Sequence, residues 1–283
     1  MNSPIKSPRH QPKQKPKPRS GAPFPSGRGT HSQPRPAHPA RKGSSSDSES
    51  TVVGRHPVLA VLKHQRDRAR RLWAVKDGPA DVLEAARSAG IEVKHATPDE
   101  LAGRAPAGVP HQGFVLECGP FPYADLESFT EVPDITLVLD GVEDPRNFGA
   151  AARAAFALGA ELLVVPGERA APCSASAYKA SAGALAQIPV ARAGNLRRAL
   201  EQLQQKGAWL VGAEADGQQA PWSVDMKGKI VLVIGGEDRG LRRLTREACD
   251  HVVSIPMSDP QMSLNAADAA TILLYEARRQ RSS

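Results

Sequence analysis

Three stretches of this sequence place polar residues directly after apolar runs of strand length. Asn147 and Arg153 follow the run 135–140, and Glu237 follows the run 229–236. Ser263 and Asn265 follow the run 251–257. An amide can orient a hydroxyl group, a carboxylate can accept a hydrogen bond, and a guanidinium can stabilise developing negative charge. Because open α/β sheets bind ligands beyond the carboxyl ends of their strands, these side chains predict a shared ligand site.

The segments that must position these residues alternate between strands and helices from residue 135 onward. Strands are expected at 135–140, 161–166, 188–193, 208–215, 229–236 and 251–257. Helices are expected at 147–159, 174–186, 194–206, 239–248 and 263–281. Most of the strand runs are apolar throughout, which is typical of a parallel sheet covered on both faces. The pattern therefore predicts a doubly wound α/β domain over residues 135–283.

Each candidate residue also has a purely structural interpretation. Asn147 could cap the helix that follows it. Ser263 stands where the N-cap of the last helix belongs, and simple capping is the structural alternative for both Ser263 and Asn265. Arg153 could pair with the acids at 143 and 144, and Glu237 could be a solvated loop acid. Gly235 could allow a close backbone approach to a ligand or could belong to an ordinary turn.

The sequence before residue 135 divides into three parts. Residues 1–50 are rich in Pro, Ser, Lys and Arg, so they cannot bury enough apolar surface to fold and are expected to be disordered. Residues 51–119 predict a small α/β domain, with helices at 52–65, 79–90 and 98–105 and strands at 71–77, 91–96 and 113–119. Residues 120–134 carry three prolines and read as a linker.

The positive charge of the chain lies mainly in its tail. The net charge of the whole sequence is +7, and residues 1–50 hold ten basic and two acidic side chains. The tail could tether RNA loosely or simply aid solubility. Two further sets of arginines could contact RNA or form solvated faces, namely Arg66, Arg68, Arg70 and Arg71, and Arg239, Arg242 and Arg243.

Several classes of protein are disfavoured by what the sequence contains. Gly240 is followed by Leu241 and Arg242 rather than Lys-Ser/Thr, so the segment is no P-loop. Residues 140–145 carry three acids where a dinucleotide-binding fold would hold pyrophosphate. Three cysteines without CxxC spacing argue against a metal site and for a reducing compartment. With no apolar run of ~18 residues and no secretory signal, we expect a cytoplasmic protein without a membrane or metal partner.

The polar segments resemble the three motifs of the SpoU (TrmH-type) RNA ribose 2′-O-methyltransferases of the SPOUT superfamily. Residues 144–149 with Arg153 match the first motif, and residues 235–237 with Gly240 match the second. Residues 255–257 followed by 263–265 match the third. Residues 54–63 and 110–113 resemble the small L30e/L7Ae-like substrate-binding domain of the RlmB subgroup. The resemblance covers about residues 52–280.

This resemblance implies a C-terminal trefoil knot that binds S-adenosyl-L-methionine, and a homodimer with the last helix at its interface. It implies cofactor contacts at Gly235, Ile255 and Leu264, and a catalytic site lined by Asn147, Arg153, Glu237, Ser263 and Asn265. In such a site Glu237 could accept a hydrogen bond from Arg153 or from the dimer partner. Transfer of an activated methyl group to a ribose hydroxyl requires that the hydroxyl be positioned and lose its proton. Since arginine keeps its proton, we expect Arg153 to hold a phosphate and stabilise the oxyanion rather than to act as a base.

Two positions depart from the family pattern. Members often carry Asn-Val-Ser-x-Ala after the Ser-Leu pair, whereas this chain has Asn-Ala-Ala-Asp-Ala at 265–269. Ser258-Asp259-Pro260 replaces the usual glycine after Met257, and Asp259 adds a carboxylate near the expected RNA path.

The leading hypothesis is an S-adenosylmethionine-dependent RNA 2′-O-methyltransferase that acts on a guanosine of 23S rRNA during rRNA processing. A tRNA substrate is the main alternative. A catalytically inactive RNA-binding or ribosome-assembly protein of the same fold is another. A small-molecule methyltransferase is disfavoured by the front domain and the basic tail.

Overall fold

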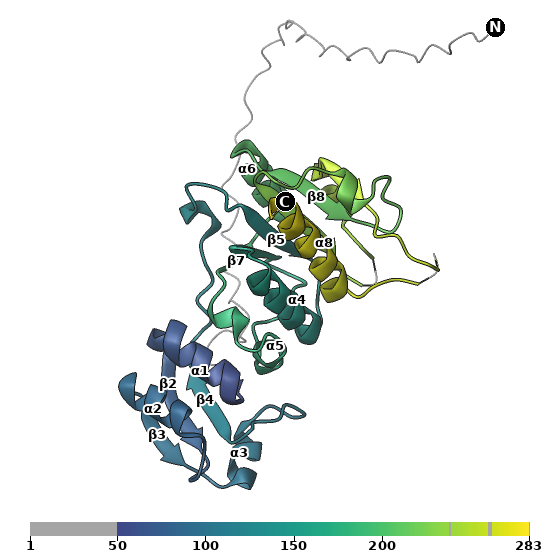
Figure 1. Ribbon diagram of the computed structural model, residues 1–283. Coiled ribbons are helices and arrows are strands. Elements are labelled where there is room, and N and C mark those ends of the chain that lie inside the picture. The colour runs from purple at the N-terminus through teal and green to yellow at the C-terminus, as the bar shows by residue number, and fades with distance from the viewer. Residues whose placement is uncertain (1–49, 238, 260–261, 283) are drawn as a thin grey trace, which may run out of the picture. The chain divides into compact units, whose positions relative to one another are not determined.

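A computed structural model describes residues 50–237, 239–259 and 262–282 of the chain. The tail predicted at residues 1–50 lies outside this part of the chain except for Ser50, and so does Pro260. The described residues form two β-sheets with helices around them (Figure 1). None of the helices within these ranges has the length and apolar character needed to cross a membrane.

The first sheet belongs to the front part of the chain and has the strand order β1-β4-β2-β3. β2 and β3 are parallel, and β4 runs antiparallel to β1 and β2. Its strands are β1 (Ser50–Val53), β2 (Ala69–Ala74), β3 (Glu92–His95) and β4 (Phe114–Cys118). The helices of this part are α1 (Arg55–His64), the 3₁₀ turn η1 (Arg66–Arg68), α2 (Ala80–Ser88) and α3 (Pro98–Arg104). The sequence prediction missed β1, a four-residue edge strand followed by Gly54 and α1.

The second sheet contains six parallel strands in the order β10-β8-β9-β5-β6-β7. The strands are β5 (Ile135–Asp140), β6 (Leu162–Pro166), β7 (Val190–Ala193), β8 (Trp209–Ala213), β9 (Ile230–Gly235) and β10 (His251–Val253). The helices are α4 (Pro145–Ala157), α5 (Ala175–Ala180), α6 (Leu196–Gln205), α7 (Arg243–Ala248) and α8 (Ala266–Arg281). Short 3₁₀ turns are η2 (Leu126–Ser128), η3 (Ala184–Ala186) and η4 (Pro221–Ser223). The predicted parallel α/β architecture is confirmed.

Apolar side chains cover both faces of the parallel sheet. Leu137 and Leu139 of β5 belong to the cluster that includes residues of α4 and α8. Val138, between them, belongs to the opposite cluster with residues of α6. Because successive side chains of a strand point to opposite faces, a strand buried on both sides must be apolar throughout. This explains the unbroken apolar runs of the central strands.

Several predicted elements have different bounds in the structure, among them three in the region after β6. β10 ends at Val253 rather than at residue 257, because it pairs with β8 only as far as Ala213, where β8 ends. The helix expected at 174–186 is divided into α5 and η3, since Ala182 and Gly183 adopt φ values of +50° and +91°. α7 begins at Arg243 rather than at residue 239.

The two helices that carry candidate site residues start at other residues than predicted. The Asp144 carboxylate caps α4 by accepting a hydrogen bond from the Arg146 N–H at 2.8 Å. Asn147 therefore lies in the first turn of α4, and its interpretation as an N-cap is wrong. The Asn265 side chain caps α8 by accepting from the Asp268 N–H at 2.9 Å. The N-cap predicted at Ser263 is therefore also wrong.

The arginines of the front part do not form one exposed RNA-binding run. Arg68 is only 7% exposed. Its guanidinium donates to Tyr178 Oη at 2.7 Å and to the Gly119 carbonyl at 3.0 Å. Arg71 pairs with Glu92 at 2.8 Å. The prediction of an RNA contact is therefore wrong for Arg68, because its side chain is buried and its guanidinium binds groups within the protein.

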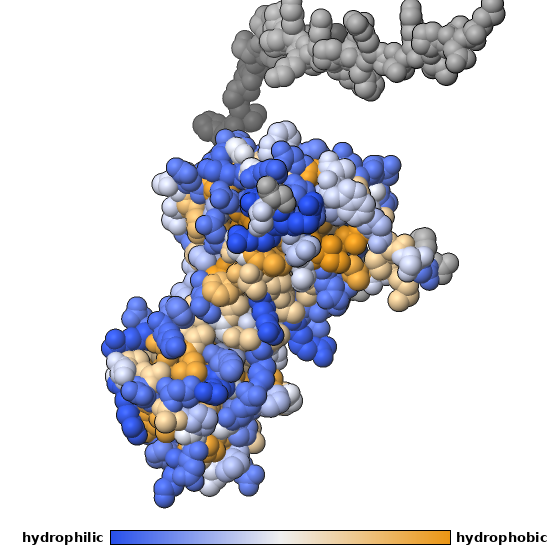
Figure 2. Space-filling view, in the orientation of Figure 1, coloured by the Kyte–Doolittle hydropathy of each residue, from blue (hydrophilic) through white to orange (hydrophobic). Residues whose placement is uncertain are grey.

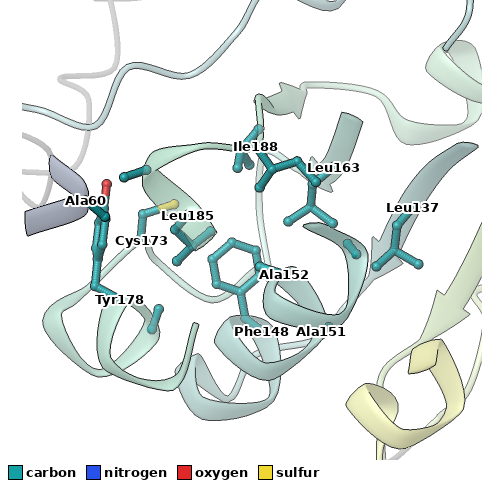
Figure 3. Packing of buried hydrophobic residues seen from close by; sticks show 14 of the residues in the cluster. Ala60, Leu137, Phe148, Ala151, Ala152, Leu163, Cys173, Tyr178, Leu185 and Ile188 are labelled. Atoms are coloured by element: carbon teal, nitrogen blue, oxygen red, sulfur yellow. The ribbon is translucent and has the colours of Figure 1, made fainter. Parts of the chain in front are cut away.

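Phe148 is the largest apolar side chain that α4 buries. Figure 3 shows its ring among Leu185, Ala152 and other apolar side chains of the same cluster. Replacing Phe148 with alanine should lower the free energy of unfolding by about 3–5 kcal/mol, because it leaves a cavity in a packed core. Denaturant unfolding followed by circular dichroism measures this change. Trp222→Ala, at a side chain that is 62% exposed, should cost no more than about 0.5 kcal/mol; equal losses would contradict the expected role of Phe148.

Candidate functional site

The candidate residues follow β5, β9 and β10, which lie in one half of the sheet in the order β10-β8-β9-β5 and run parallel. Asp140 at the end of β5 lies opposite Gly235 at the end of β9, and Ala213 at the end of β8 lies opposite Ile234. All three strands are parallel, so the segments that follow them leave the sheet at the same edge. This register places the three polar stretches of the sequence around one part of the molecule.

A cavity of about 450 Å³ lies at this edge, here called the first cavity. Its volume falls in the range of small-molecule sites. It is lined by six of the eight residues selected from the sequence, namely Gly235, Glu237, Ile255, Ser263, Leu264 and Asn265. Its other lining residues are Ala213, Glu214, Ala215, Ile234, Gly236, Gly240, Met257, Met262, Ala266 and Ala269.

Asn147 reaches this site through Glu237. Its side-chain amide donates a short hydrogen bond to the Glu237 carboxylate, which joins the start of α4 to the turn after β9 across 90 positions of sequence. From the sequence, Arg153 or a second copy of the chain was a possible hydrogen-bond donor to Glu237. The structure gives Asn147 as its partner instead.

Arg153 is not brought to the first cavity. It lies on α4 six positions after Asn147, which at about 100° per residue turns it to a different side of the helix. Its side chain is exposed. Within residues 50–237, 239–259 and 262–282 it makes no hydrogen bond or ion pair, and it lines neither cavity described in this section. The alternative pairing of Arg153 with Asp144 is wrong, because Asp144 pairs with Arg146 at 3.2 Å.

Two carboxylates hold the turn that follows β9. Glu214 Oε1 accepts the Leu241 N–H at 2.5 Å, and Asp140 Oδ2 accepts the Arg242 N–H at 3.0 Å. The Arg242 Nε lies 3.3 Å from Asp140 Oδ1. These two atoms form an ion pair, but Oδ1 accepts no hydrogen bond among the described residues. The Asp140 side chain is fully buried. The strands on either side of β9 thus fasten the segment that returns from it.

The glycines of this turn are required by close approach of the backbone to itself. A Cβ atom on Gly235 would lie 2.1 Å from the Gly240 carbonyl carbon, and one on Gly236 would lie 2.3 Å from the Gly141 oxygen. Gly240 adopts a φ of +61°. Gly235 lines the first cavity, but the reason for glycine at this position is the turn itself rather than the approach of a ligand.

A second cavity of about 360 Å³ adjoins the first and shares Gly236, Glu237 and Gly240 with it. Arg169, Arg239 and Arg242 line it together with the acids of residues 140–144. Arg169 adopts a φ of +56°, a conformation that is uncommon for a residue with a side chain. The Glu237 turn therefore separates an apolar-walled cavity from one with several arginines.

The capping acid of α4 is kept ionised by its neighbours. The hydrogen bond from the Arg146 N–H, followed by that from the Arg146 side chain, holds the pKa of the Asp144 carboxyl below its usual value. A negative charge at the N-terminal end of α4 also interacts favourably with the positive end of the helix dipole. Asp144 thus supports the helix turn that carries Asn147.

Sequence reasoning missed three functional features of this site. Asp140, Glu214 and Arg169 follow strands in the sequence, but an acid or arginine after a strand is too common to stand out. The structure distinguishes them by the backbone groups that the acids bind and by the backbone strain at Arg169.

Comparison with known proteins assigns both halves of the chain. Residues 134–275 match the SpoU rRNA Methylase family, and residues 51–124 match a domain described as RNA 2′-O ribose methyltransferase substrate binding. A protein of Mycolicibacterium vanbaalenii named as an uncharacterized tRNA/rRNA methyltransferase is 38% identical, covering 88% of this chain and 86% of that protein. The 23S rRNA (guanosine-2′-O-)-methyltransferase RlmB of Pseudomonas putida is 37% identical, covering 81% and 96%.

A solved structure agrees with these sequence matches. The SpoU methyltransferase AviRb of Streptomyces viridochromogenes, in complex with AdoMet, superposes with a TM-score of 0.72. It is 31% identical, and the match covers 83% of this chain and 91% of AviRb. Both matched domains occur here in one chain and in order, and every residue that lines the two cavities lies within the matched range 134–275. The chain belongs to the SpoU rRNA methylase family.

Proposed function

We propose that this protein methylates the ribose 2′-hydroxyl of a guanosine in 23S rRNA. The chain is an RNA methyltransferase of the SpoU family that uses S-adenosylmethionine. The guanosine and the 23S rRNA are supported by its 37% identity to RlmB over 96% of that protein. Ribosomal RNA as substrate implies that the protein works in the cytoplasm.

The first cavity suits S-adenosylmethionine in size and chemistry. Ile234, Ile255 and Leu264 offer apolar surface to an adenine ring, and the turn after β9 offers backbone polar groups. The first turn of α8 opens into the same cavity at Ala266, where free N–H groups favour a carboxylate. We therefore assign cofactor binding to Gly235, Ile255 and Leu264.

S-adenosylmethionine supplies, when bound, a methyl group already activated on a sulfonium. The protein must then position the ribose hydroxyl and assist the loss of its proton. Glu237 lines both cavities and Asn147 donates to it, so this pair can orient that hydroxyl. Ser263 and Asn265 add polar groups at the rim of the first cavity.

The second cavity is assigned to the RNA. Arg169 and Arg239 line it, and arginine is well suited to binding phosphate oxygens. The front domain, residues 51–119, is assigned to RNA binding, which its match to a substrate-binding domain supports. The knotted path of residues 135–283 and the role of the tail stay predictions.

We further propose that the protein is a homodimer through α4 and α8. Phe156 of α4 and Ile272 and Tyr275 of α8 are 44%, 38% and 60% exposed. Figure 2 shows apolar surface gathered over these two helices. Because Arg153 lies one helical turn from Phe156 and away from its own cavity, we assign it to the site of the partner protomer, where it stabilises the oxyanion.

Mapping of 2′-O-methyl groups in total RNA from cells with and without this gene tests the proposed substrate. We expect deletion to remove one methyl group from a 23S rRNA guanosine and the intact gene to restore it. Loss of a tRNA methyl group instead would replace the proposed substrate with the alternative one. An unchanged methylation map would favour the non-catalytic RNA-binding alternative.

A further inference from the structure

Glu214 is a carboxylate in the wall of the first cavity that the motifs of the family do not include. It follows β8 directly, and its backbone N–H donates to the Val253 carbonyl at 3.0 Å. Its Oε1 accepts the Leu241 N–H at 2.5 Å, which fixes the orientation of the side chain. Both of its oxygens would lie within 2.8 Å of a Cβ atom on Gly240. The carboxylate is therefore held against the turn that forms one wall of the cavity.

The charge of the first cavity is negative. Among the described residues that line it, Glu214 and Glu237 are the charged side chains, and none is Lys, Arg or His. Glu237 is bound by the neutral amide of Asn147 and forms no ion pair within the described residues, although arginines line the adjoining second cavity. Arg246 interacts electrostatically with Glu214, but its guanidinium donates to both oxygens of Asp216, at 2.8 and 3.0 Å.

The donor and the product of methyl transfer differ mainly in charge. S-adenosylmethionine carries a sulfonium, whereas S-adenosylhomocysteine carries a neutral thioether on the same adenosine and amino acid. Contacts to the adenosine or to the amino acid therefore bind both molecules alike. A fixed carboxylate in a partly desolvated cavity attracts the sulfonium form more strongly.

We propose that Glu214 makes the first cavity prefer the cationic methyl donor over the neutral product. This rests on the proposed binding of S-adenosylmethionine in that cavity. The bond from Oε1 to Leu241 leaves Oε2 as the less engaged oxygen of a carboxylate whose charge acts on the cavity. The attraction between Glu214 and the bound molecule weakens as soon as the methyl group leaves, because the product is no longer a sulfonium. Glu214 therefore favours release of the product after each turnover.

Glu214→Gln removes the charge and keeps an oxygen that can accept the Leu241 N–H. Calorimetric titration of the full-length variant with S-adenosylmethionine and with S-adenosylhomocysteine measures the two affinities separately. The ratio of donor to product affinity should fall by about three- to tenfold, while product affinity stays unchanged. Sinefungin carries a protonated amine near the sulfonium position, so its affinity for the variant should fall as the affinity for the donor does. Glu131→Gln makes the same charge change at a side chain that is 84% exposed and does not line the cavity, so its ratio should equal that of the wild type.

An equal loss of affinity for donor and product would overturn the proposal, since it would indicate a contact to the shared adenosine or amino acid. An unchanged ratio would overturn it as well. A second measurement needs no variant: raising NaCl from about 0.05 to about 0.5 M should weaken donor binding to the wild type more than product binding. If the wild type binds neither molecule, the assignment of the cofactor cavity itself is wrong, an outcome distinct from the first two.

Discussion

Replacing Arg153 with alanine is expected to abolish RNA methylation while leaving the affinity for S-adenosylmethionine unchanged. The charge of Arg153 is proposed to act only on the oxyanion that develops during transfer, and loss of one such stabilising group costs about a hundredfold or more in rate. Arg153 does not line the first cavity of its own chain among the described residues. Single-turnover methylation of 23S rRNA measures the rate, and calorimetry measures cofactor binding. Loss of cofactor binding in this variant would mean that Arg153 belongs to another part of the site.

A mixing experiment tests whether Arg153 acts across the proposed dimer. The variants Arg153→Ala and Glu237→Ala should each be inactive alone. When they are refolded together, half of the dimers contain one of each, and each such dimer has one site with both residues intact. About a quarter of wild-type activity should therefore return. No recovery, despite the presence of mixed dimers, would place Arg153 and Glu237 in the same chain's site.

Replacing Gly235 with alanine is expected to lower both cofactor affinity and the methylation rate by about a hundredfold, since displacement of a site by about 1 Å has effects of this size. The added Cβ would stand 2.1 Å from the Gly240 carbonyl carbon. Backbone atoms cannot yield as a flexible side chain can, so the turn that carries Glu237 must shift. Calorimetry and single-turnover kinetics measure the two losses.

The matched control for Gly235→Ala is Gly194→Ala. A Cβ atom on Gly194 would meet nothing within 4 Å, so this variant should keep wild-type affinity and rate. Equal behaviour of the two variants would mean that the turn after β9 tolerates the displacement. If the Gly235→Ala variant does not unfold cooperatively, the substitution has disrupted the core of the domain rather than the turn alone.

The sequence predicted the central strands and the residues around the first cavity, because both leave local patterns. Strands β5 and β9 are buried on both faces, and continuous apolar runs such as 230–234 follow directly from that burial. Residues Ser263 to Asn265 stand out because polar residues precede a long amphipathic helix. Patterns of this kind depend only on neighbours in the chain.

Features that depend on distant neighbours could not be predicted. The bond between Asn147 and Glu237 joins residues 90 positions apart. The burial of Arg68 depends on Tyr178, which is 110 positions away, so the sequence placed it in an exposed basic run. The choice of cap for α8 is local but was also open, because Ser and Asn are equally good caps; the structure has Asn265 as the N-cap rather than Ser263.

The attachment of residues 241 and 242 to acids from two different strands has a consequence for how ligands meet this protein. Both anchors, Glu214 and Asp140, are made within the chain alone. The backbone at residues 241 and 242 therefore has its shape before anything binds, and little of its conformational entropy remains to be lost on association. We therefore expect the rate of ligand association to depend on diffusion and charge rather than on rearrangement of this part of the backbone.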